Sequence, residues 1–180
     1  MSDKPNILFI MSDDHAAHAI TAYGSRINHT PHLDRIAEQG LRHDNCHVTN
    51  SICTPSRATI LTGQYGHING VKTLGDTLDG SRPILLQKLL KQGGYQTAIF
   101  GKWHLGHGGD ADPTGFDQWK VLPGQGDYHD PTFITPEGEV QFDGYVNELI
   151  TAMCTDYLVQ RDPDKPSFLC CDHKAPHRWW

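Results

Sequence analysis

The segment best suited to covalent chemistry begins at Cys53 and reads Cys-Thr-Pro-Ser-Arg. Because Pro55 favours the first turn of a helix, Cys53 should lie at the positive end of a helix that runs from Pro55 to Leu61. Arg57 lies one turn further on and can reach the same space. A cysteine placed in this way is a candidate nucleophile, and the alternative is a small buried side chain beside a helix cap. Spacing alone leaves both interpretations open.

A pair of adjacent carboxylates, Asp13 and Asp14, follows the apolar run 7–11. Two neighbouring acids at the end of a buried strand repel each other unless a cation is present. Oxygen ligands suit Ca²⁺ or Mg²⁺ better than zinc. The pair is therefore a candidate metal site, and an acidic turn or helix cap is the alternative.

A third candidate is the sequence Gly-Lys-Trp-His-Leu-Gly, which starts at Gly101. In an extended segment, residues two apart face the same way, so Lys102 and His104 should point together while Trp103 packs opposite. A cation and an imidazole aimed at one point suit a tetrahedral anion. The alternative is a surface lysine next to a histidine that is hydrogen-bonded within the fold.

The remaining histidines widen the choice, since the chain has twelve. His177 closes the segment Lys-Ala-Pro-His, in which Pro176 restricts its neighbour and fixes the approach of the imidazole. A role for His177 at an anion and a structural role are both open. The sequence leaves the roles of His15, His107 and His129 undecided between contacts to metal or substrate and ordinary packing.

The elements that must hold these side chains follow from hydrophobic patterning. Strands are expected at 6–11, 42–49, 95–100 and 167–171, and helices at 30–37, 55–61, 84–91 and 144–159. Residues 106–138 are rich in Gly, Pro and Asp and are expected to form long active-site loops. Alternating strands and helices predict an α/β fold with a mostly parallel sheet. In such sheets ligands bind beyond the carboxyl ends of the strands, which is where the polar clusters at 13–14, 102–104 and 172–177 occur.

The composition argues against several classes of protein. Lys plus Arg is 15 and Asp plus Glu is 21, so the formal charge is −6, and this balance argues against a nucleic-acid surface. No apolar stretch approaches the roughly 18 residues of a membrane span. No signal peptide is visible, which predicts a cytoplasmic protein, or a periplasmic or secreted one if the N-terminus is incomplete. Five cysteines without regular spacing argue against a disulfide framework.

Three motifs together resemble those of type I sulfatases, in the alkaline-phosphatase-like superfamily. The family motif C-T-P-S-R-x-x-x-x-T-G is matched completely from Cys53 to Gly63. The run N-I-L-F-I-M-S-D-D resembles the first strand of these enzymes, and G-K-W-H-L-G resembles their second motif. The Pro-His step at 176–177 also matches a family segment. The similarity extends over essentially all 180 residues.

The resemblance implies a sulfuric ester hydrolase whose nucleophile is made by oxidising Cys53 to formylglycine (3-oxoalanine). In the family the hydrated aldehyde attacks sulfur, the lysine bridges nucleophile and sulfate, and the first histidine hydrogen-bonds the nucleophile. By this resemblance, the implied partners are a formylglycine-generating maturation enzyme and a small-molecule or glycan sulfate ester. The resemblance further implies that the catalytic residues are Cys53, Arg57, Lys102, His104 and His177, and that a Ca²⁺ or Mg²⁺ ion is bound by Asp13, Asp14 and Cys53.

Family chains are considerably longer than this one. We therefore expect residues 1–180 to be the N-terminal part of the sulfatase catalytic domain, with an alkaline-phosphatase-like sheet that is incomplete at the C-terminus. The C-terminal part and subdomain, which carry further metal ligands and a second lysine in the family, would be absent, and this part alone should bind calcium weakly. Carbohydrate or aryl sulfates are the expected substrates. The alternatives are a phosphonate or phosphate ester hydrolase of the same superfamily and a catalytically inactive fragment.

Overall fold

A computed structural model of the chain describes residues 4–179. Its centre is a six-stranded sheet with the strand order β1-β6-β2-β3-β4-β5. The strands β1, β6, β2 and β3 run parallel to one another, and β4 and β5 continue the sheet antiparallel. The strands are β1 (Ile7–Met11), β2 (Gln96–Lys102), β3 (Gln118–Leu122), β4 (Thr132–Thr135), β5 (Gly138–Gln141) and β6 (Ser167–Asp172). The predicted α/β fold with a mostly parallel sheet is thereby confirmed.

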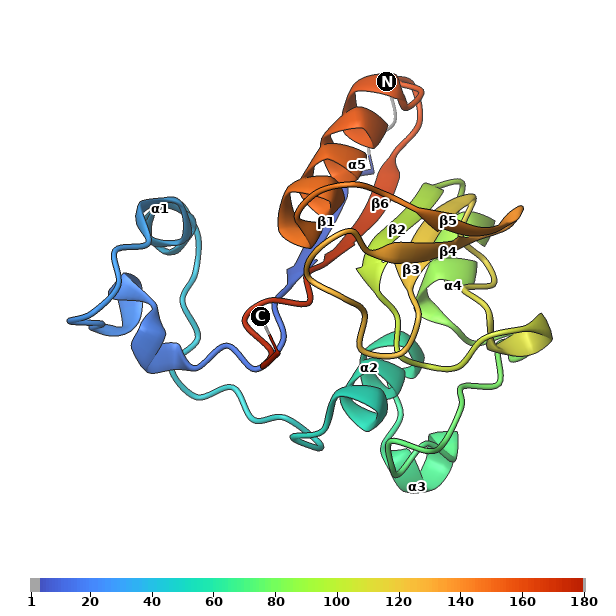
Figure 1. The fold of residues 1–180 in the computed structure, drawn as a ribbon, viewed down its shortest axis with the longest axis horizontal. Coiled ribbons are helices and arrows are strands. Elements are labelled where there is room, and N and C mark those ends of the chain that lie inside the picture. The colour runs from blue at the N-terminus through green and yellow to red at the C-terminus, as the bar shows by residue number, and fades with distance from the viewer. Residues whose placement is uncertain (1–3, 180) are drawn as a thin grey trace.

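Helices cover both faces of the sheet, as Figure 1 shows. The helix α5 (Val146–Gln160) packs on one face, where its side chains join alternate residues of β2 and β6 in one apolar cluster. The helices α2 (Cys53–Thr62) and α4 (Leu86–Gln92) pack on the other face in a second cluster. Period-two alternation divides the buried strand β6 between them, with Phe168 facing α2 and Leu169 facing α5.

The expected helices are present with shifted ends. The helix predicted at 30–37 is α1 (Pro31–Gln39), and it begins with proline in its first turn. The helix predicted from Pro55 begins two residues earlier, at Cys53, and ends before Gly63 in the left-handed conformation. The sequence did not indicate a further short helix, α3 (Gly66–Asn69), or the three short 3₁₀ turns Ala17–Ala19, Thr21–Tyr23 and Gly109–Ala111.

Two predictions of local structure were wrong. Residues 42–49 form no strand; they are exposed, and Arg42 bonds instead to Asp44 at 2.8 Å. The expected loops at 106–138 contain β3, β4 and the start of β5. Apolar side chains such as Val121 and Phe133 are fully buried there, so packing overrides the high Gly and Pro content of the surrounding turns.

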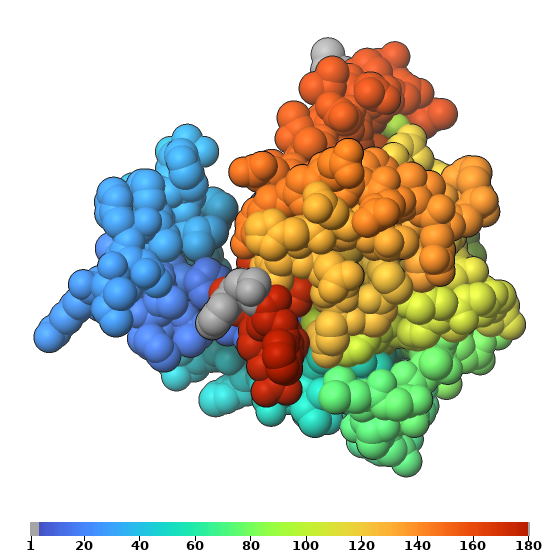
Figure 2. Space-filling view, in the orientation of Figure 1, coloured from blue at the N-terminus to red at the C-terminus, as the bar shows by residue number. Residues whose placement is uncertain are grey.

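The first strand is also less buried than its sequence suggested. Among the described residues β1 lies at an edge of the sheet, and Leu8 and Ile10 are 52% and 55% exposed. Residues 14–52, which follow it, contain no buried residue. In Figure 1 their helix α1 stands apart from the sheet, and Figure 2 shows this segment as a separate blue lobe. Apolar side chains are therefore uncovered on both β1 and this lobe.

No helix in residues 4–179 combines the length and the apolar character needed to cross a bilayer.

Candidate active site

Cys53 is the first residue of α2, and its side chain is half-buried. Ile52 before it is extended, and the amide of Ser56 donates to the Ile52 carbonyl at 3.0 Å. Pro55 occupies the first turn, where its missing N–H leaves no bond unmade. The free N–H groups of this turn carry partial positive charge, so the Cys53 side chain lies in an environment that favours an anion.

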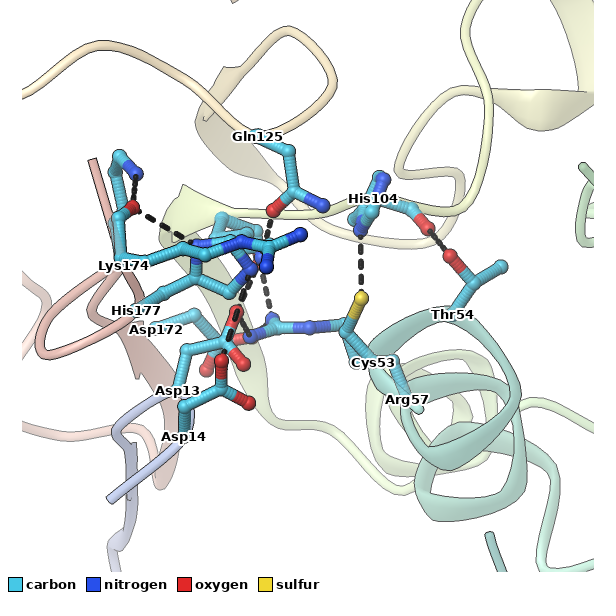
Figure 3. Close-up of polar contacts among 12 residues, drawn as sticks. Asp13, Asp14, Cys53, Thr54, Arg57, His104, Gln125, Asp172, Lys174 and His177 are labelled. Carbon is cyan, nitrogen blue, oxygen red and sulfur yellow. Dashed lines mark hydrogen bonds and ion pairs between the residues drawn. The ribbon is translucent and has the colours of Figure 1, made fainter. Parts of the chain in front are cut away.

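His104 faces Cys53 from the end of β2, with its Nδ1 3.1 Å from the Cys53 sulfur (Figure 3). The hydroxyl of Thr54 donates to the His104 carbonyl at 3.0 Å, so two bonds tie this residue to α2. Burial first, and then the nearby cations Lys102 and Arg57, lower the pKa of His104 to about 4. The imidazole is therefore neutral at pH 7 and can either donate or accept a proton at Nδ1.

Lys102 and His104 converge on the site, but not by strand alternation. β2 ends at Lys102, and His104 has a φ of 54°, in the left-handed region that non-glycine residues rarely adopt. Trp103 between them is buried and packs edge-on against Phe116, as expected for the side chain that points away. A turn after the strand, and not an extended segment, aims the imidazole at Cys53.

A buried cluster of charges lies next to Cys53. Lys102 is completely buried, and its ammonium donates to the carboxylate of Asp13 and to the Gln125 side-chain oxygen at 2.5 Å. Arg57 donates to the Lys102 carbonyl at 2.5 Å and to Asp172 at 3.2 Å, and it lies 3.6 Å from Asp13. Each buried cation therefore has a carboxylate partner, which offsets the cost of removing it from water.

Asp172, the last residue of β6, is the most perturbed acid of the cluster. Burial raises its pKa to about 7, while the neighbouring guanidinium of Arg57 opposes the rise. Its Oδ2 accepts from Arg57, and its buried Oδ1 has no partner among the described residues. The carboxyl group can thus hold or release a proton near neutral pH.

Asp14 and His177 form the open side of the site. The Asp14 side chain is 61% exposed and lies 3.7 Å from Nε2 of His177. The other ring nitrogen of His177, Nδ1, lies 3.1 Å from the Arg178 carbonyl. Because a carbonyl only accepts, Nδ1 carries a proton in this contact, and the other ring nitrogen, Nε2, faces Asp14. The Tyr128 hydroxyl donates to the His177 carbonyl at 2.6 Å and holds this segment in place.

An open cleft runs beside Cys53, between the end of β1 and the start of α2. The strand end contributes Asp13 and Asp14 to its walls, and α2 contributes Cys53, Ser56 and Arg57. His15 also lines the cleft, where its Nδ1 lies 3.1 Å from the Ser12 hydroxyl. A substrate anion entering here would meet the sulfur and the Arg57 guanidinium together.

The structure brings together the residues that the resemblance assigns to the catalytic and metal sites. Cys53 contacts His104, Arg57 and Lys102 both lie against Asp13, and His177 lies beside Asp14. His107 and His129 lie elsewhere: Nε2 of His107 accepts weakly from the Gly124 amide, and His129 packs against the Tyr145 ring. Their local contacts give neither a place in the cluster.

Several residues of the site were not singled out by the sequence. Asp172 ends a hydrophobic run, and its carboxylate was noted only as part of a polar segment. Gln125 lies in a turn within the expected loops, and Thr54 was noted only as a motif letter. Lys174 is buried, with its ammonium 4.2 Å from the centre of the Tyr128 ring. The available signal in the sequence was an ionisable residue close after an apolar, strand-like run, as at Asp172 and Lys174.

Asp13 and Asp14 are the type of ligand that a hard cation prefers, but two side chains are fewer than such an ion needs. Asp13 and Asp14 supply carboxylate oxygens, whereas Ca²⁺ takes six to eight oxygen ligands. No group of three or more His, Cys, Asp or Glu suited to a metal occurs within residues 4–179. The half-buried Cys53 side chain lies at a helix start and faces the cleft.

The carboxyl edge of the parallel sheet thus brings two buried cations and a pair of carboxylates next to a cysteine at a helix start, an arrangement that can bind an anion. The sulfatase family model matches residues 5–180, and the chain belongs to the sulfatase family.

Among its relatives, an N-acetylglucosamine-6-O-sulfatase of Bacteroides thetaiotaomicron is 44% identical over 180 residues, which cover 98% of this chain and 31% of that protein. Human arylsulfatase G is 36% identical over 151 residues, which cover 76% of this chain and 29% of that protein. A solved structure of a protein in complex with its substrate D-glucosamine-2-N,6-O-disulfate is 44% identical with a TM-score of 0.94, and the match covers 99% of this chain and 36% of that one. The chain thus spans about a third of the length of these curated relatives.

Proposed function

We propose that this chain carries the nucleophile side of a sulfatase active site that hydrolyses sulfate esters, with Cys53 converted to formylglycine. One observation carries the proposal: the Cys53 sulfur lies 3.1 Å from Nδ1 of His104, at the edge of a buried cluster containing Lys102 and Arg57. These residues come from separate elements and converge on a helix N-terminus, an arrangement suited to a tetrahedral anion.

The charge balance of the site supports the need for an added cation. Three carboxylates, Asp13, Asp14 and Asp172, are matched by the cations Arg57, Lys102 and Lys174. With Asp172 ionised these charges balance, and a sulfate ester then brings a further negative charge into the cluster. A divalent cation held by Asp13 and Asp14 would supply the missing positive charge and polarise the sulfuryl oxygens.

The side chains of this chain have distinct roles in the proposed reaction. Formylglycine at position 53 would supply the nucleophile, with the neutral His104 imidazole within hydrogen-bonding distance of it. Arg57 and Lys102 would bind the sulfuryl oxygens. Nε2 of His177 lies on the open side of the site beside Asp14, where it would give a proton to the departing alcohol oxygen.

We propose that these residues are the N-terminal part of a larger catalytic domain. Three observations support this: the relatives are about three times longer, the proposed metal site has two carboxylates, Asp13 and Asp14, within the residues that the structure describes, and apolar side chains are uncovered on β1 and α1. Exposed rows such as Leu8 with Ile10, and Leu33 with Ile36, are costly to leave in water. The 180-residue chain should therefore bind calcium weakly and turn over slowly until the remainder of the domain is added.

For the substrate, we propose a 6-O-sulfated amino sugar. The support is the 44% identity to the N-acetylglucosamine-6-O-sulfatase and to the protein solved with a glucosamine disulfate. The test compares kcat/KM for N-acetylglucosamine-6-sulfate, an aryl sulfate, and matched phosphate and phosphonate esters, using the complete protein. A preference for the amino-sugar sulfate is expected, whereas a preference for the phosphorus esters would overturn the assignment.

The nucleophile is tested separately by mass spectrometry. The chain is co-expressed with a formylglycine-generating enzyme, and the peptide that contains Cys53 is examined for the replacement of CH₂SH by CHO. The matched control is Cys46, a free and exposed cysteine that should keep its thiol within the same tryptic peptide. An unmodified Cys53 under these conditions would favour a non-catalytic protein.

A further inference from the structure

The turn that follows β3 brings one polar side chain to the buried charge cluster. β3 ends at Leu122, which is paired with Lys102 at the end of β2. The chain then reverses, and the amide of Gly126 donates to the Pro123 carbonyl at 2.9 Å. Gln125 lies within this turn, three residues beyond the end of the strand. The parallel pairing of β2 and β3 therefore places Gln125 next to the lysine.

Glycines on both sides of Gln125 set the shape of this turn. Gly124 and Gly126 have φ angles of 53° and 70°, in the left-handed region that favours glycine. A Cβ atom at Gly126 would also lie 2.7 Å from Cδ1 of Leu122, so the turn packs closely on the strand end. The position of Gln125 is thus fixed by the backbone around it.

The amide oxygen of Gln125 accepts a hydrogen bond from the Lys102 ammonium at 2.5 Å (Figure 3). Because an ammonium only donates, the oxygen of the amide group and not its nitrogen must face the lysine. Lys102 is completely buried, and among the described residues its ammonium also donates to the carboxylate of Asp13. The ammonium is therefore held from two sides, by the end of β1 and by the turn after β3.

These two bonds determine where the third N–H group of Lys102 points, because the donors of an ammonium are tetrahedral. Asp13 alone would hold the lysine less firmly, since its carboxylate also lies 3.6 Å from Arg57 and is a proposed metal ligand. The Gln125 oxygen has no second hydrogen-bond partner among the described residues. Being neutral, it can hold the lysine without cancelling the positive charge.

We propose that Gln125 is a positioning residue of the sulfatase reaction, which holds Lys102 so that its remaining N–H group points at a sulfuryl oxygen. This inference rests on the proposed function, in which Lys102 binds that oxygen. A donor with a fixed direction stabilises the developing charge without having to reorganise. The neutral amide is essential, because a carboxylate in its place would keep the hydrogen bond but would cancel the lysine charge and repel the ester.

The experiment measures kcat and KM for N-acetylglucosamine-6-sulfate, using the complete protein that carries formylglycine. Gln125→Ala should lower kcat/KM by about 10- to 100-fold, mainly through kcat, as expected for loss of a hydrogen bond to a charged group. Gln125→Glu keeps the size and the acceptor, so it should fold normally, yet it should lose at least as much activity. It should also weaken inhibition by inorganic sulfate.

Gln118→Ala is the matched control, because Gln118 is exposed at the opposite end of β3. Its kinetic constants should be unchanged. Urea midpoints of all variants show whether each protein is folded under the assay conditions. A Gln125→Glu protein with full activity and normal inhibition by sulfate would overturn the inference.

A double-mutant cycle tests whether Gln125 acts through Lys102. In a Lys102→Met background, Gln125→Ala should lower kcat/KM by less than about twofold, because the group that it positions is gone. A purely structural role would give the same fold-loss in both backgrounds, and that result would also overturn the inference.

Failure of this inference is distinguishable from failure of the proposed function. If the unaltered complete protein hydrolyses no sulfate ester, the proposed function is wrong, and the role of Gln125 is rejected with it. If the unaltered protein is active and both Gln125 variants match Gln118→Ala, only the role of Gln125 is rejected.

Discussion

Nδ1 of His104 lies 3.1 Å from the sulfur of Cys53, although 51 residues separate them in the sequence. The contact joins the segment that follows the parallel strand β2 to the first residue of the helix α2. The hydroxyl of Thr54 fixes the same segment through the His104 carbonyl. The position of the imidazole relative to Cys53 is thus set by a side chain of α2 and by the backbone at His104.

This contact predicts a large effect of His104→Ala on catalysis. Loss of a positioned acid–base group typically lowers the rate by about 10²–10⁴-fold. In the complete protein carrying formylglycine, kcat/KM for a sulfate ester should fall within that range. His67→Ala is the matched control, because His67 is exposed on α3 and stacks only on Tyr65. Equal losses in the two variants would contradict a role specific to His104.

The two adjacent carboxylates should differ in what they contribute to stability. Asp13→Asn leaves the fully buried ammonium of Lys102 without its carboxylate partner, which should lower the free energy of unfolding by about 3–5 kcal/mol. Asp14→Asn changes an exposed side chain and should cost about 0.5 kcal/mol or less. Both variants should weaken calcium binding.

Urea unfolding and calorimetric titration with Ca²⁺ separate these effects. A stable Asp14→Asn protein with unchanged calcium affinity would argue against Asp14 as a ligand. Equal destabilisation by both substitutions would contradict the charge pairing of Asp13.

The pH dependence of stability contains two opposing terms. Burial raises the pKa of Asp172 to about 7, so folding favours its protonated form, and its contribution to stability is lost as the pH rises from about 4 to 7. Burial lowers the pKa of His104 from 6.5 to about 4, so folding favours its neutral form. Its contribution is present above pH 6.5 and is lost as the pH falls toward 4.

Two substitutions should separate these terms. Asp172→Asn removes the first, so its stability should rise more steeply between pH 4 and 6.5 than that of the unaltered chain. His104→Asn removes the second, so its stability should fall as the pH rises through the same range. Each proton contributes at most about 1.4 kcal/mol per pH unit. Urea midpoints at several pH values give the slopes, and equal slopes in the two variants would refute the assignment.

Gly101 should tolerate no side chain. Its φ is +113°, and a Cβ atom there would lie 2.0 Å from the Asp172 carbonyl oxygen on β6. Gly94 also has a positive φ, +86°, but a Cβ there meets nothing within 4 Å. Gly94→Ala should therefore cost about 1–2 kcal/mol for the backbone conformation alone. Gly101→Ala should cost roughly 3 kcal/mol or more, since β2 and β6 must separate. Chemical denaturation of the two variants isolates the effect of close approach.

The sequence predicted the polar clusters well because their position follows from chain direction. Each of Asp13, Lys102 and the 172–177 segment comes at or just after the carboxyl end of a strand, and parallel strands bring those ends to one edge. The start of α2 followed from Pro55 for a similarly local reason. Local rules were enough to assemble the predicted site residues.

Prediction failed where a side chain's role depends on what surrounds it. Asp172 is the last letter of an apolar run, and only the tertiary contact with Arg57 gives it a function in the charge cluster. Gln125 holds Lys102 from a turn whose conformation is not encoded in hydrophobic period. The strand β3 lies within a Gly- and Pro-rich region, where burial of Val121 decides the structure. Residues 42–49 contain a few apolar side chains, but they pair with no strand and stay exposed.

The exposed apolar side chains of β1 have a practical consequence for experiments on these 180 residues. Leu8 and Ile10 are more than half exposed on a strand whose outer backbone edge has no partner among the described residues. Such an edge is a template for pairing with another molecule's strand. We expect concentration-dependent self-association, visible by light scattering, and replacing both side chains with lysine should suppress it. Without such a change, dilute handling of the chain will be needed.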